Sequence, residues 1–207
     1  LPALPTRCSS DLAIFKENAK GWAPVLTKLY QACFCLGQVP HSWRGSILCP
    51  IYKQGDHSDP SNYRLIALLD VEGKGFVLNL LEDLENWVTA SKILPFSQTG
   101  FRPKSSTLDN IIAVAYMAYK TRLPKTCPLF CCFVDYSAAF DRVDRNFLWS
   151  KLTLWGVPTH LLQGIIALYS HTWVRIKLDH SHVSQPFETT NGLKQGCVLA
   201  PILFNLY

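Results

Sequence analysis

The chain has 207 residues, of which 48% are hydrophobic and 17% are charged, and its formal net charge is +5. This composition excludes an intrinsically disordered chain, and the length suits one domain with a buried core. The mildly basic balance permits a phosphate-rich partner without requiring one, because dedicated nucleic-acid modules are more strongly basic.

The eight cysteines form no C-x-x-C pair, and no pair of histidines has zinc-finger spacing, so we expect no zinc site. Several thiols lie in apolar runs such as 130–134, where cysteine packs as a small hydrophobic residue. A reduced, intracellular protein of the nucleus or cytoplasm is therefore expected. The uncharged stretch 152–174 contains Pro158 and several polar residues, so we expect no membrane span and no membrane partner.

In chain order, residues 1–12 look foreign to the rest. Residues 5–12 match one reading frame of a common sequencing adapter, which suggests a non-native tail, although an ordinary flexible terminus is the alternative. Apolar residues at helical spacing predict a helix over 22–36 that ends at Gly37. A strand over 46–52 and a polar turn over 53–60 follow.

Residues 71–90 are predicted to form a helix with Leu78, Leu81, Leu84 and Trp87 on one face. A loop over 97–103 precedes another helix, which Ser106 or Thr107 caps and which runs to about Lys120.

The continuous apolar run 129–135 predicts a strand that is buried on both faces and ends in an acid. Two short helices over 146–155 and 161–169, a half-exposed strand over 173–178 and an apolar helix from 198 complete the chain.

Three patterns carry candidate chemistry. Asp135 follows an apolar strand, where a carboxylate is costly unless it is paired or binds a cation such as Mg²⁺, and the alternative is a structural acid that caps the next turn. The glycines and amide of 191–201 precede an apolar helix, so free N–H groups there can meet a phosphate or a base, with a plain capped loop as the alternative. Cations beside aromatic residues or glycine turns end the segments 50–53, 62–64 and 98–102, with surface charges as the alternative.

Together and in this order, the patterns resemble the reverse transcriptases of LINE-type (non-long-terminal-repeat) retrotransposons. The last two of the matching blocks are the most specific to that family. The blocks are Pro-Ile-x-Lys at 50–53, Asn-Tyr-Arg at 62–64, Gln-x-Gly-Phe-Arg at 98–102, Phe-x-Asp-x-x-x-Ala-Phe-Asp at 133–141 and Gly-x-x-Gln-Gly-x-x-x-x-Pro-x-Leu-Phe at 192–204.

The resemblance implies an α+β right-hand polymerase, with fingers over 13–125 and a partial palm of antiparallel strands and helices over 126–207. It implies RNA-directed DNA polymerase activity in the parent protein, with an RNA template, a DNA primer, deoxynucleoside triphosphates and two Mg²⁺ ions as partners. The implied site comprises Asp135 as catalytic metal ligand, the Tyr136 carbonyl on the same ion, and nucleotide contacts from Phe140, Gln195, Gly196, Arg102, Arg64 and Lys53.

The chain departs from the family pattern in several places. No Asp-Asp pair occurs up to Tyr207, so we expect these 207 residues to lack the family's Asp-Asp hairpin and the thumb, and to be inactive on their own. Leu65 stands where the family has proline, and Glu82-Asp83 where a basic residue is common.

Two alternatives therefore stay open: a catalytically dead pseudogene fragment with at most weak RNA binding, and an unrelated intracellular α/β interaction domain.

The last helix, from Val198, is expected to lack a partner for its apolar face, which predicts marginal stability and exposed hydrophobic surface.

Overall fold

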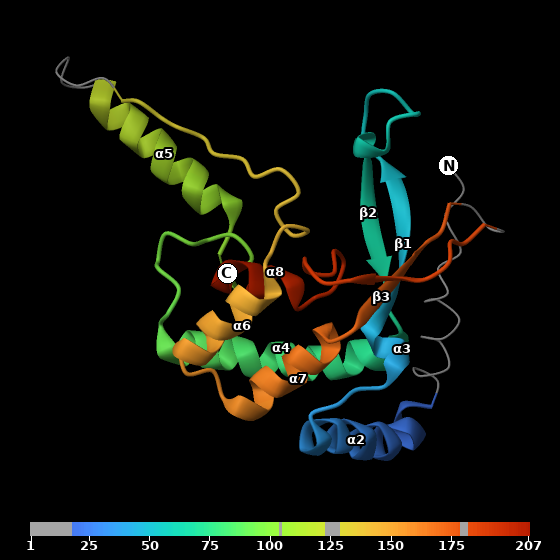
Figure 1. Cartoon of the computed structure of the whole chain (residues 1–207). Coiled ribbons are helices and arrows are strands. Elements are labelled where there is room, and N and C mark those ends of the chain that lie inside the picture. Colours follow the sequence, from blue (N-terminus) through green and yellow to red (C-terminus); the bar gives the residue numbers. More distant parts are fainter. Residues whose placement is uncertain (1–17, 104, 123–128, 179–181) are drawn as a thin grey trace.

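The computed structural model describes residues 18–103, 105–122, 129–178 and 182–207, so the expected foreign tail over 1–12 lies outside the described residues. Helices gather below and beside a small sheet, and helix α5 projects away from them (Figure 1). The elements are α2 (Ala19–Leu36), α3 (His41–Arg44), β1 (Gly45–Tyr52), the 3₁₀ turn η1 (Pro60–Asn62), β2 (Tyr63–Leu68), α4 (Val71–Ser91), α5 (Thr107–Arg122), α6 (Arg145–Leu154), α7 (Thr159–Tyr169), β3 (Thr172–Ile176), β4 (Phe187–Thr189) and α8 (Ala200–Leu206).

The sheet has the strand order β2-β1-β3-β4. Strand β1 pairs antiparallel with β2 from Ile47↔Leu68 to Tyr52↔Tyr63, and β3 pairs antiparallel with β4. Strands β1 and β3 run parallel, with Gly45 opposite Trp173, so the sheet is mixed rather than antiparallel. The α+β class is confirmed. The division into fingers and palm at residue 125 stays a prediction. Strands β1 and β2 precede this position and β3 and β4 follow it, so both sides of the division contribute to the sheet.

The helices predicted over 22–36, 71–90, 146–155 and 161–169 are confirmed as α2, α4, α6 and α7. Gly37 ends α2 in the left-handed conformation, as expected. The predicted face of α4 is partly wrong, because Leu78 is 53% exposed while Phe76, Leu80 and Leu84 are fully buried. These three residues recur every four positions and so lie one above another on the side of α4 that packs against α7.

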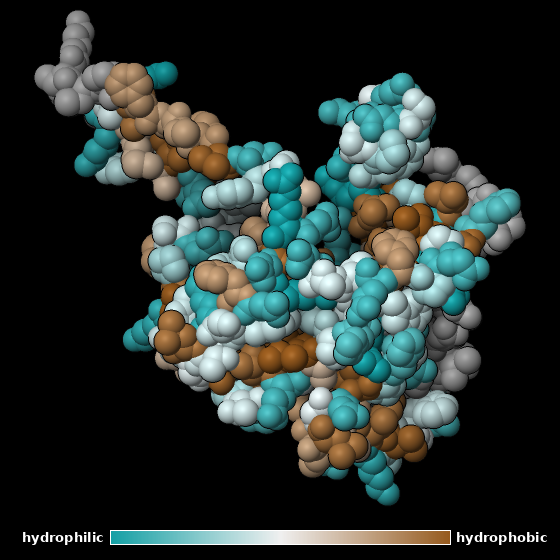
Figure 2. Space-filling view, viewed as in Figure 1, coloured by the Kyte–Doolittle hydropathy of each residue, from teal (hydrophilic) through white to brown (hydrophobic). Residues whose placement is uncertain are grey.

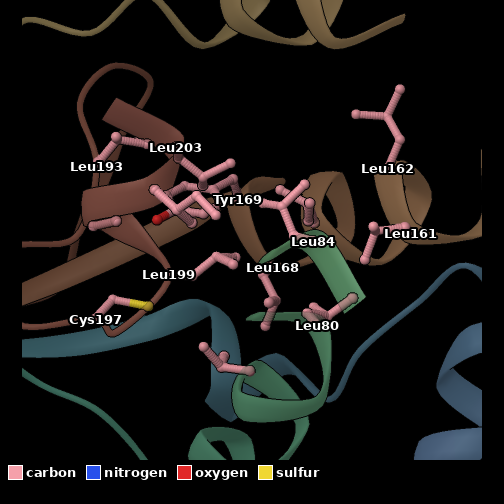
Figure 3. Packing of buried hydrophobic residues seen from close by; sticks show 14 of the residues in the cluster. Leu80, Leu84, Leu161, Leu162, Leu168, Tyr169, Leu193, Cys197, Leu199 and Leu203 are labelled. Carbon is pink, nitrogen blue, oxygen red and sulfur yellow. The ribbon is translucent and has the colours of Figure 1, made fainter. Parts of the chain in front are cut away.

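The last helix does not lack a partner, so that prediction is wrong. On α8, Ala200, Ile202, Leu203 and Leu206 are all buried. They join residues of α4, α6 and α7 in one hydrophobic core, which includes Leu84, Leu168, Tyr169 and Leu203 (Figure 3). Contact with α6 supplies the cover that the sequence did not reveal.

The strand predicted over 129–135 is also wrong. This segment is extended without strand pairing, and Phe130, Phe133 and Val134 are 88%, 86% and 71% exposed. A strand buried on both faces needs neighbours on both edges, and no described strand pairs with this segment. Asp135 is consequently exposed, not placed at the end of a buried strand.

Helix α5 also carries exposed apolar side chains. Its predicted cap is confirmed, since the Ser106 Oγ accepts from the Leu108 N–H at 3.2 Å and the Asp109 carboxylate accepts from the Ser106 N–H at 2.8 Å. None of the described residues of α5 is buried, and apolar side chains follow the projecting helix at the upper left of Figure 2. The exposed hydrophobic surface expected on the last helix lies instead on α5, on 129–136 and on side chains of other segments, such as Leu36, Phe96 and Leu154. None of the helices among the described residues has the length and hydrophobicity needed to cross a bilayer.

Candidate active site

A cleft of about 1170 Å³ opens between the β1–β2 hairpin and the turn over 135–141. It brings together six of the eight residues that the sequence assigned to the site. Arg102 and Gly196 are not among the lining residues. The lining consists of Pro50, Lys53, His57, Ser58, Pro60, Ser61, Tyr63, Arg64, Leu65, Asp135, Tyr136, Ser137, Ala138, Ala139, Phe140, Asp141, Ile176, Leu178 and Gln195.

Hydrogen bonds within the β1–β2 turn hold its shape and thereby place Lys53. The Lys53 N–H donates to the Asn62 carbonyl at 2.8 Å, and the Asn62 amide donates to the Asp56 carbonyl at 2.9 Å. The Tyr52 and His57 rings stack with centroids 3.9 Å apart. The Ser58 N–H, which donates to the Asp56 carboxylate, holds the pKa of that group below its ordinary value.

The cations and the acids occupy opposite walls of the cleft. Lys53 and Arg64 are exposed on the hairpin, whereas Asp135 and Asp141 are exposed on the turn that faces it. The turn closes with a hydrogen bond from the Asp141 N–H to the Ala138 carbonyl at 3.0 Å. An anion with several phosphate groups and an accompanying cation matches this separation of charge.

Phe140 lies at the edge of the cleft with its ring fixed from behind. It stacks on Phe204 of α8 with centroids 4.8 Å apart, and the edge of Phe101 approaches it at 6.1 Å. These contacts make Phe140 a rigid wall of the cleft.

The loop over 191–196 is bonded directly to the end of the 135–141 turn. The Gly192 N–H donates to the Val143 carbonyl at 2.9 Å, and the Leu193 N–H donates to the Phe140 carbonyl at 2.8 Å. Gly192 has φ +81°, and a Cβ atom built there lies 2.8 Å from the Asp141 carbonyl oxygen. The two most specific motif blocks of the sequence are therefore neighbours in space.

The same loop also reaches the sheet. The Gln195 carbonyl accepts from the Ala67 N–H of β2 at 2.7 Å, which fixes the backbone of Gln195 beside the cleft. Gly196 has φ +107°, and a Cβ atom built there lies 3.0 Å from the Ala67 carbonyl oxygen. Gly196 thus shapes the close approach of the loop to β2, although it does not line the cleft.

Arg102 is held outside the cleft. Its Nη1 donates to the Pro95 carbonyl at 3.1 Å. The preceding loop docks on α8, where the Asn205 amide donates to the Gly100 carbonyl at 2.8 Å and its Oδ1 accepts from the Gln98 amide at 3.0 Å. The Gln98–Arg102 block therefore supports Phe140 through Phe101.

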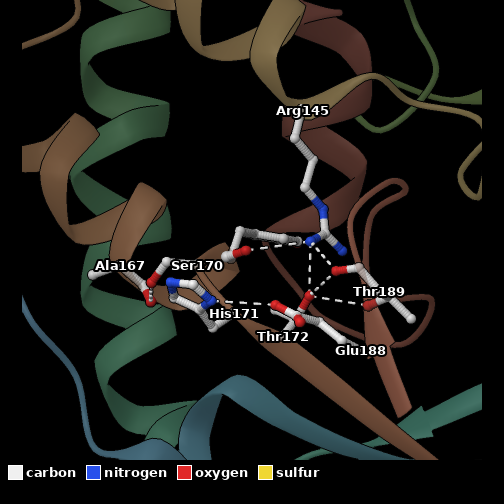
Figure 4. Close-up of polar contacts among 8 residues, drawn as sticks. Arg145, Ala167, Ser170, His171, Thr172, Glu188 and Thr189 are labelled. Carbon is white, nitrogen blue, oxygen red and sulfur yellow. Dashed lines mark hydrogen bonds and ion pairs between the residues drawn. The ribbon is translucent and has the colours of Figure 1, made fainter.

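Sequence reasoning missed Arg145, the side chain that holds the 191–192 segment. It is buried, and it makes hydrogen bonds to five groups, some of which Figure 4 shows. Burial lowers the pKa of its guanidinium. In sequence, an arginine in the first turn of a helix looks like a surface residue, so no signal marked it. The acceptors are the carbonyls of Gly192 (2.8 Å), Tyr169 (3.2 Å), Thr189 (3.0 Å) and Asn191 (3.1 Å), and the Thr172 hydroxyl (2.7 Å).

Lys194 is a second cation that the sequence did not single out. Its Nζ donates to the Trp43 carbonyl at 3.1 Å and lies 5.7 Å from the centre of the Tyr169 ring. Burial of the ammonium lowers the pKa of Lys194 to about 8. Lys194 thus links the 191–196 loop to α3 through the Trp43 carbonyl and to α7 through the Tyr169 ring.

The depressed pKa of Lys194 predicts a pH effect on stability. Unfolded lysine titrates near 10.4, so the unfolded chain binds more protons than the folded chain above about pH 8. The free energy of unfolding of the wild type should therefore rise by up to about 1 kcal/mol between pH 7 and 9 relative to Lys194→Met. Urea unfolding of both proteins at several pH values measures this difference. A difference that stays constant, or falls, contradicts the assignment.

The donor groups of the cleft limit what metal it can hold. No group of three or more His, Cys, Asp or Glu side chains suited to a metal ion occurs among the described residues. Asp135 and Asp141 offer two carboxylates, which is the number that Mg²⁺ takes when substrate phosphates supply further ligands. The carboxylate oxygens of the cleft lining are therefore of the donor type that suits Mg²⁺ held together with substrate phosphates.

A family model described as reverse transcriptase (RNA-dependent DNA polymerase) matches residues 51–207, which is more than half of the chain. The chain belongs to the reverse transcriptase family. The matched range contains all eight assigned site residues and every residue of the cleft lining except Pro50. Family membership rules out the alternative of an unrelated interaction domain.

Curated relatives of this reverse transcriptase chain come from transposable elements. It is 28% identical to a probable RNA-directed DNA polymerase from transposon BS of Drosophila melanogaster, over all of this chain and 22% of that protein. It is 28% identical to the corresponding protein of the X-element, over 88% of this chain and 20% of that protein. It is 25% identical to the retrovirus-related Pol polyprotein of the type-2 retrotransposable element R2DM, over 88% of this chain and 17% of that protein. Both elements are also from Drosophila melanogaster.

These relatives confirm the resemblance to retrotransposon reverse transcriptases and do not favour the alternative of a dead fragment. The chain spans about a fifth of the length of the relatives it matches.

Proposed function

We propose that the cleft binds the incoming deoxynucleoside triphosphate of an RNA-directed DNA polymerase, and that this chain contributes the binding surface for nucleotide and template. The observation that carries the proposal is the placement of Lys53 and Arg64 opposite Asp135 in one cleft with Gln195 beside them. Family membership supports the same class of substrate.

Each wall of the cleft has a proposed task. Lys53 and Arg64 bind the triphosphate, because exposed cations on a rigid hairpin attract phosphate oxygens with little loss of entropy. Gln195 contacts the nucleotide or the template base, and Gly196 keeps its loop close to β2. The triphosphate contact implied for Arg102 stays a prediction, since its guanidinium is bonded to Pro95 in this structure.

Phe140 is proposed to select the sugar. Its ring is fixed against Phe204, so it does not yield to a 2′-hydroxyl group, and a deoxyribose fits beside it better than a ribose. The selectivity then depends on the aromatic stack behind Phe140 as much as on Phe140 itself.

The chemistry proposed for the whole protein is phosphoryl transfer from the nucleotide to a primer 3′-hydroxyl. Magnesium supplies Lewis-acid activation and charge neutralisation on the phosphates when it is bound, with Asp135 and the Tyr136 carbonyl as proposed ligands from this chain. The residues of this chain contribute by positioning the triphosphate and by stabilising its negative charge. Polymerisation also requires carboxylates beyond those of the cleft, and it is a property proposed for the parent protein.

The cations of the cleft provide the first test. Lys53→Ala and Arg64→Ala should each weaken the binding of Mg²⁺–dATP by about 2–10-fold, because each removes one charge from the triphosphate. Isothermal titration of the purified chain measures the affinities. Lys120→Ala is the matched control, since Lys120 is an exposed cation on α5 outside the cleft. Equal losses in all three variants, or no loss in the cleft variants, contradict the proposal.

A further inference from the structure

A row of polar and aromatic side chains lies on the face of β3 that points away from the cleft. Successive residues of a strand point to opposite faces. Val174 is buried and Ile176 lines the cleft, whereas Trp173 and Arg175 line a separate pocket. The sheet therefore separates this second pocket, which we call the outer pocket, from the candidate active site.

The outer pocket is built around Trp173. The neighbouring position on β1 is Gly45, and a Cβ atom built there lies 2.1 Å from the Trp173 ring, so only glycine leaves room for the indole. His41 of α3 stacks on Trp173 with centroids 5.5 Å apart and an interplanar angle of 18°. The Arg175 guanidinium lies 5.7 Å from the centre of the same ring. These contacts hold an aromatic pair and a cation in one fixed arrangement.

The rim of the outer pocket carries two further polar residues, His171 and Glu188. His171, the residue before β3, pairs with Glu188 of β4 at 3.2 Å, and both side chains are largely exposed (Figure 4). Pro186 completes the lining, and the cavity volume is about 360 Å³. His41 and Arg175 are exposed, so a ligand reaches the aromatic stack and the cation together.

We propose that the outer pocket binds single-stranded nucleic acid. A base extends the His41–Trp173 stack, and the adjoining phosphate pairs with Arg175. Aromatic platforms combined with cations are the usual means by which proteins hold unpaired strands, because every base offers a flat face and every linkage a charge. Base-paired strands keep these faces covered, so the pocket selects unpaired nucleotides. The site does not depend on the nucleotide cleft, because the sheet lies between them.

Binding of a labelled ten-nucleotide single-stranded RNA, followed by fluorescence anisotropy without Mg²⁺ or nucleotide, tests the proposal. His41→Ala and Arg175→Ala should each weaken binding by about 3–10-fold, and Arg175→Ala should reduce the slope of log affinity against log salt by about 1. His41→Phe keeps a stacking surface and should bind within about twofold of the wild type. Glu188→Gln removes the carboxylate of the pocket and should tighten binding.

The controls separate this site from the cleft. Lys120 and Tyr116 form an exposed cation–aromatic pair on α5, with the ammonium 5.3 Å from the ring centre, comparable to the Arg175–Trp173 pair. Lys120→Ala should therefore leave RNA affinity unchanged. The two outer-pocket variants should retain the wild-type affinity for Mg²⁺–dATP, so failure of this proposal and failure of the proposed function are distinguishable. Unchanged RNA binding by His41→Ala and Arg175→Ala would falsify the proposal. Equal competition by duplex RNA of the same length also overturns it.

Discussion

Replacement of Arg145 by methionine is expected to lower the free energy of unfolding by about 3–5 kcal/mol. The guanidinium is buried and donates to four carbonyls and one hydroxyl. The Thr189 carbonyl keeps a second donor, the Thr172 hydroxyl at 2.7 Å, whereas the carbonyls of Gly192, Asn191 and Tyr169 lose the side-chain donor that they share. Gly192 and Tyr169 are buried, a buried acceptor without a partner costs about 1–3 kcal/mol, and methionine fills the volume without donating.

Urea unfolding of the wild type, Arg145→Met and Arg142→Met measures the effect. Arg142 is an exposed arginine three residues earlier, so its replacement should change the free energy of unfolding by less than about 0.5 kcal/mol. Arg145→Lys keeps the positive charge but cannot donate to all five acceptors. Its free energy of unfolding should therefore lie between those of Arg145→Met and Arg142→Met. Equal stability of Arg145→Met and Arg142→Met contradicts a supporting role for Arg145.

Substitution of Gly192 by alanine is expected to cost about 2–4 kcal/mol of unfolding free energy. The residue has φ +81°, which strains any L side chain, and the new Cβ lies 2.8 Å from the Asp141 carbonyl oxygen and 3.0 Å from the Asp141 Cα. Both neighbours are backbone atoms, so relief requires the 135–141 turn and the 191–196 loop to move apart. Because these segments form the cleft, the variant should also lose affinity for Mg²⁺–dATP.

Gly156→Ala is the matched control for Gly192→Ala. Gly156 has φ +79°, nearly the same backbone strain, but a Cβ atom there has no neighbour within 4 Å. Its replacement should cost only about 1–2 kcal/mol and should leave nucleotide affinity unchanged. If the two variants are equally stable and bind equally well, the close packing of the two motif blocks has no energetic role.

Local patterns in the sequence predicted local structure well. Helical spacing placed α2, α4, α6 and α7 within a few residues of their observed bounds, and the Ser106 cap is present because capping depends only on neighbouring residues. Strands depend on distant partners. The run over 129–135 has the composition of a buried strand but no described strand beside it, while the short strands β2 and β4 were not predicted, because pairing with β1 and β3 defines them.

The part of the candidate site that could be predicted consists of the residues that belong to the sequence motifs. Lys53, Arg64, Asp135 and Gln195 come from separate blocks of the sequence and line one cleft. The residues that support the site from behind could not be predicted, because the residue type alone does not tell a buried arginine from an exposed one. Arg145 is identified only by the carbonyls around it, which come from loops and strands later in the chain.

The cleft is proposed to bind a nucleotide through Asp135 and magnesium. The most direct test is the melting temperature of the chain with a primer–template and dNTP, measured with and without Mg²⁺, for the wild type, Asp135→Asn and Asp83→Asn. Asp135 and Asp83 are both exposed, so neither change should unfold the chain, and Asp83 lies on α4 away from the cleft. We predict that Mg²⁺ raises the melting temperature of the wild type and Asp83→Asn, as a ligand that binds only the folded state must, and that Asp135→Asn shows no such rise. An equal rise in all three proteins, or no effect of Mg²⁺ on any of them, would contradict the account.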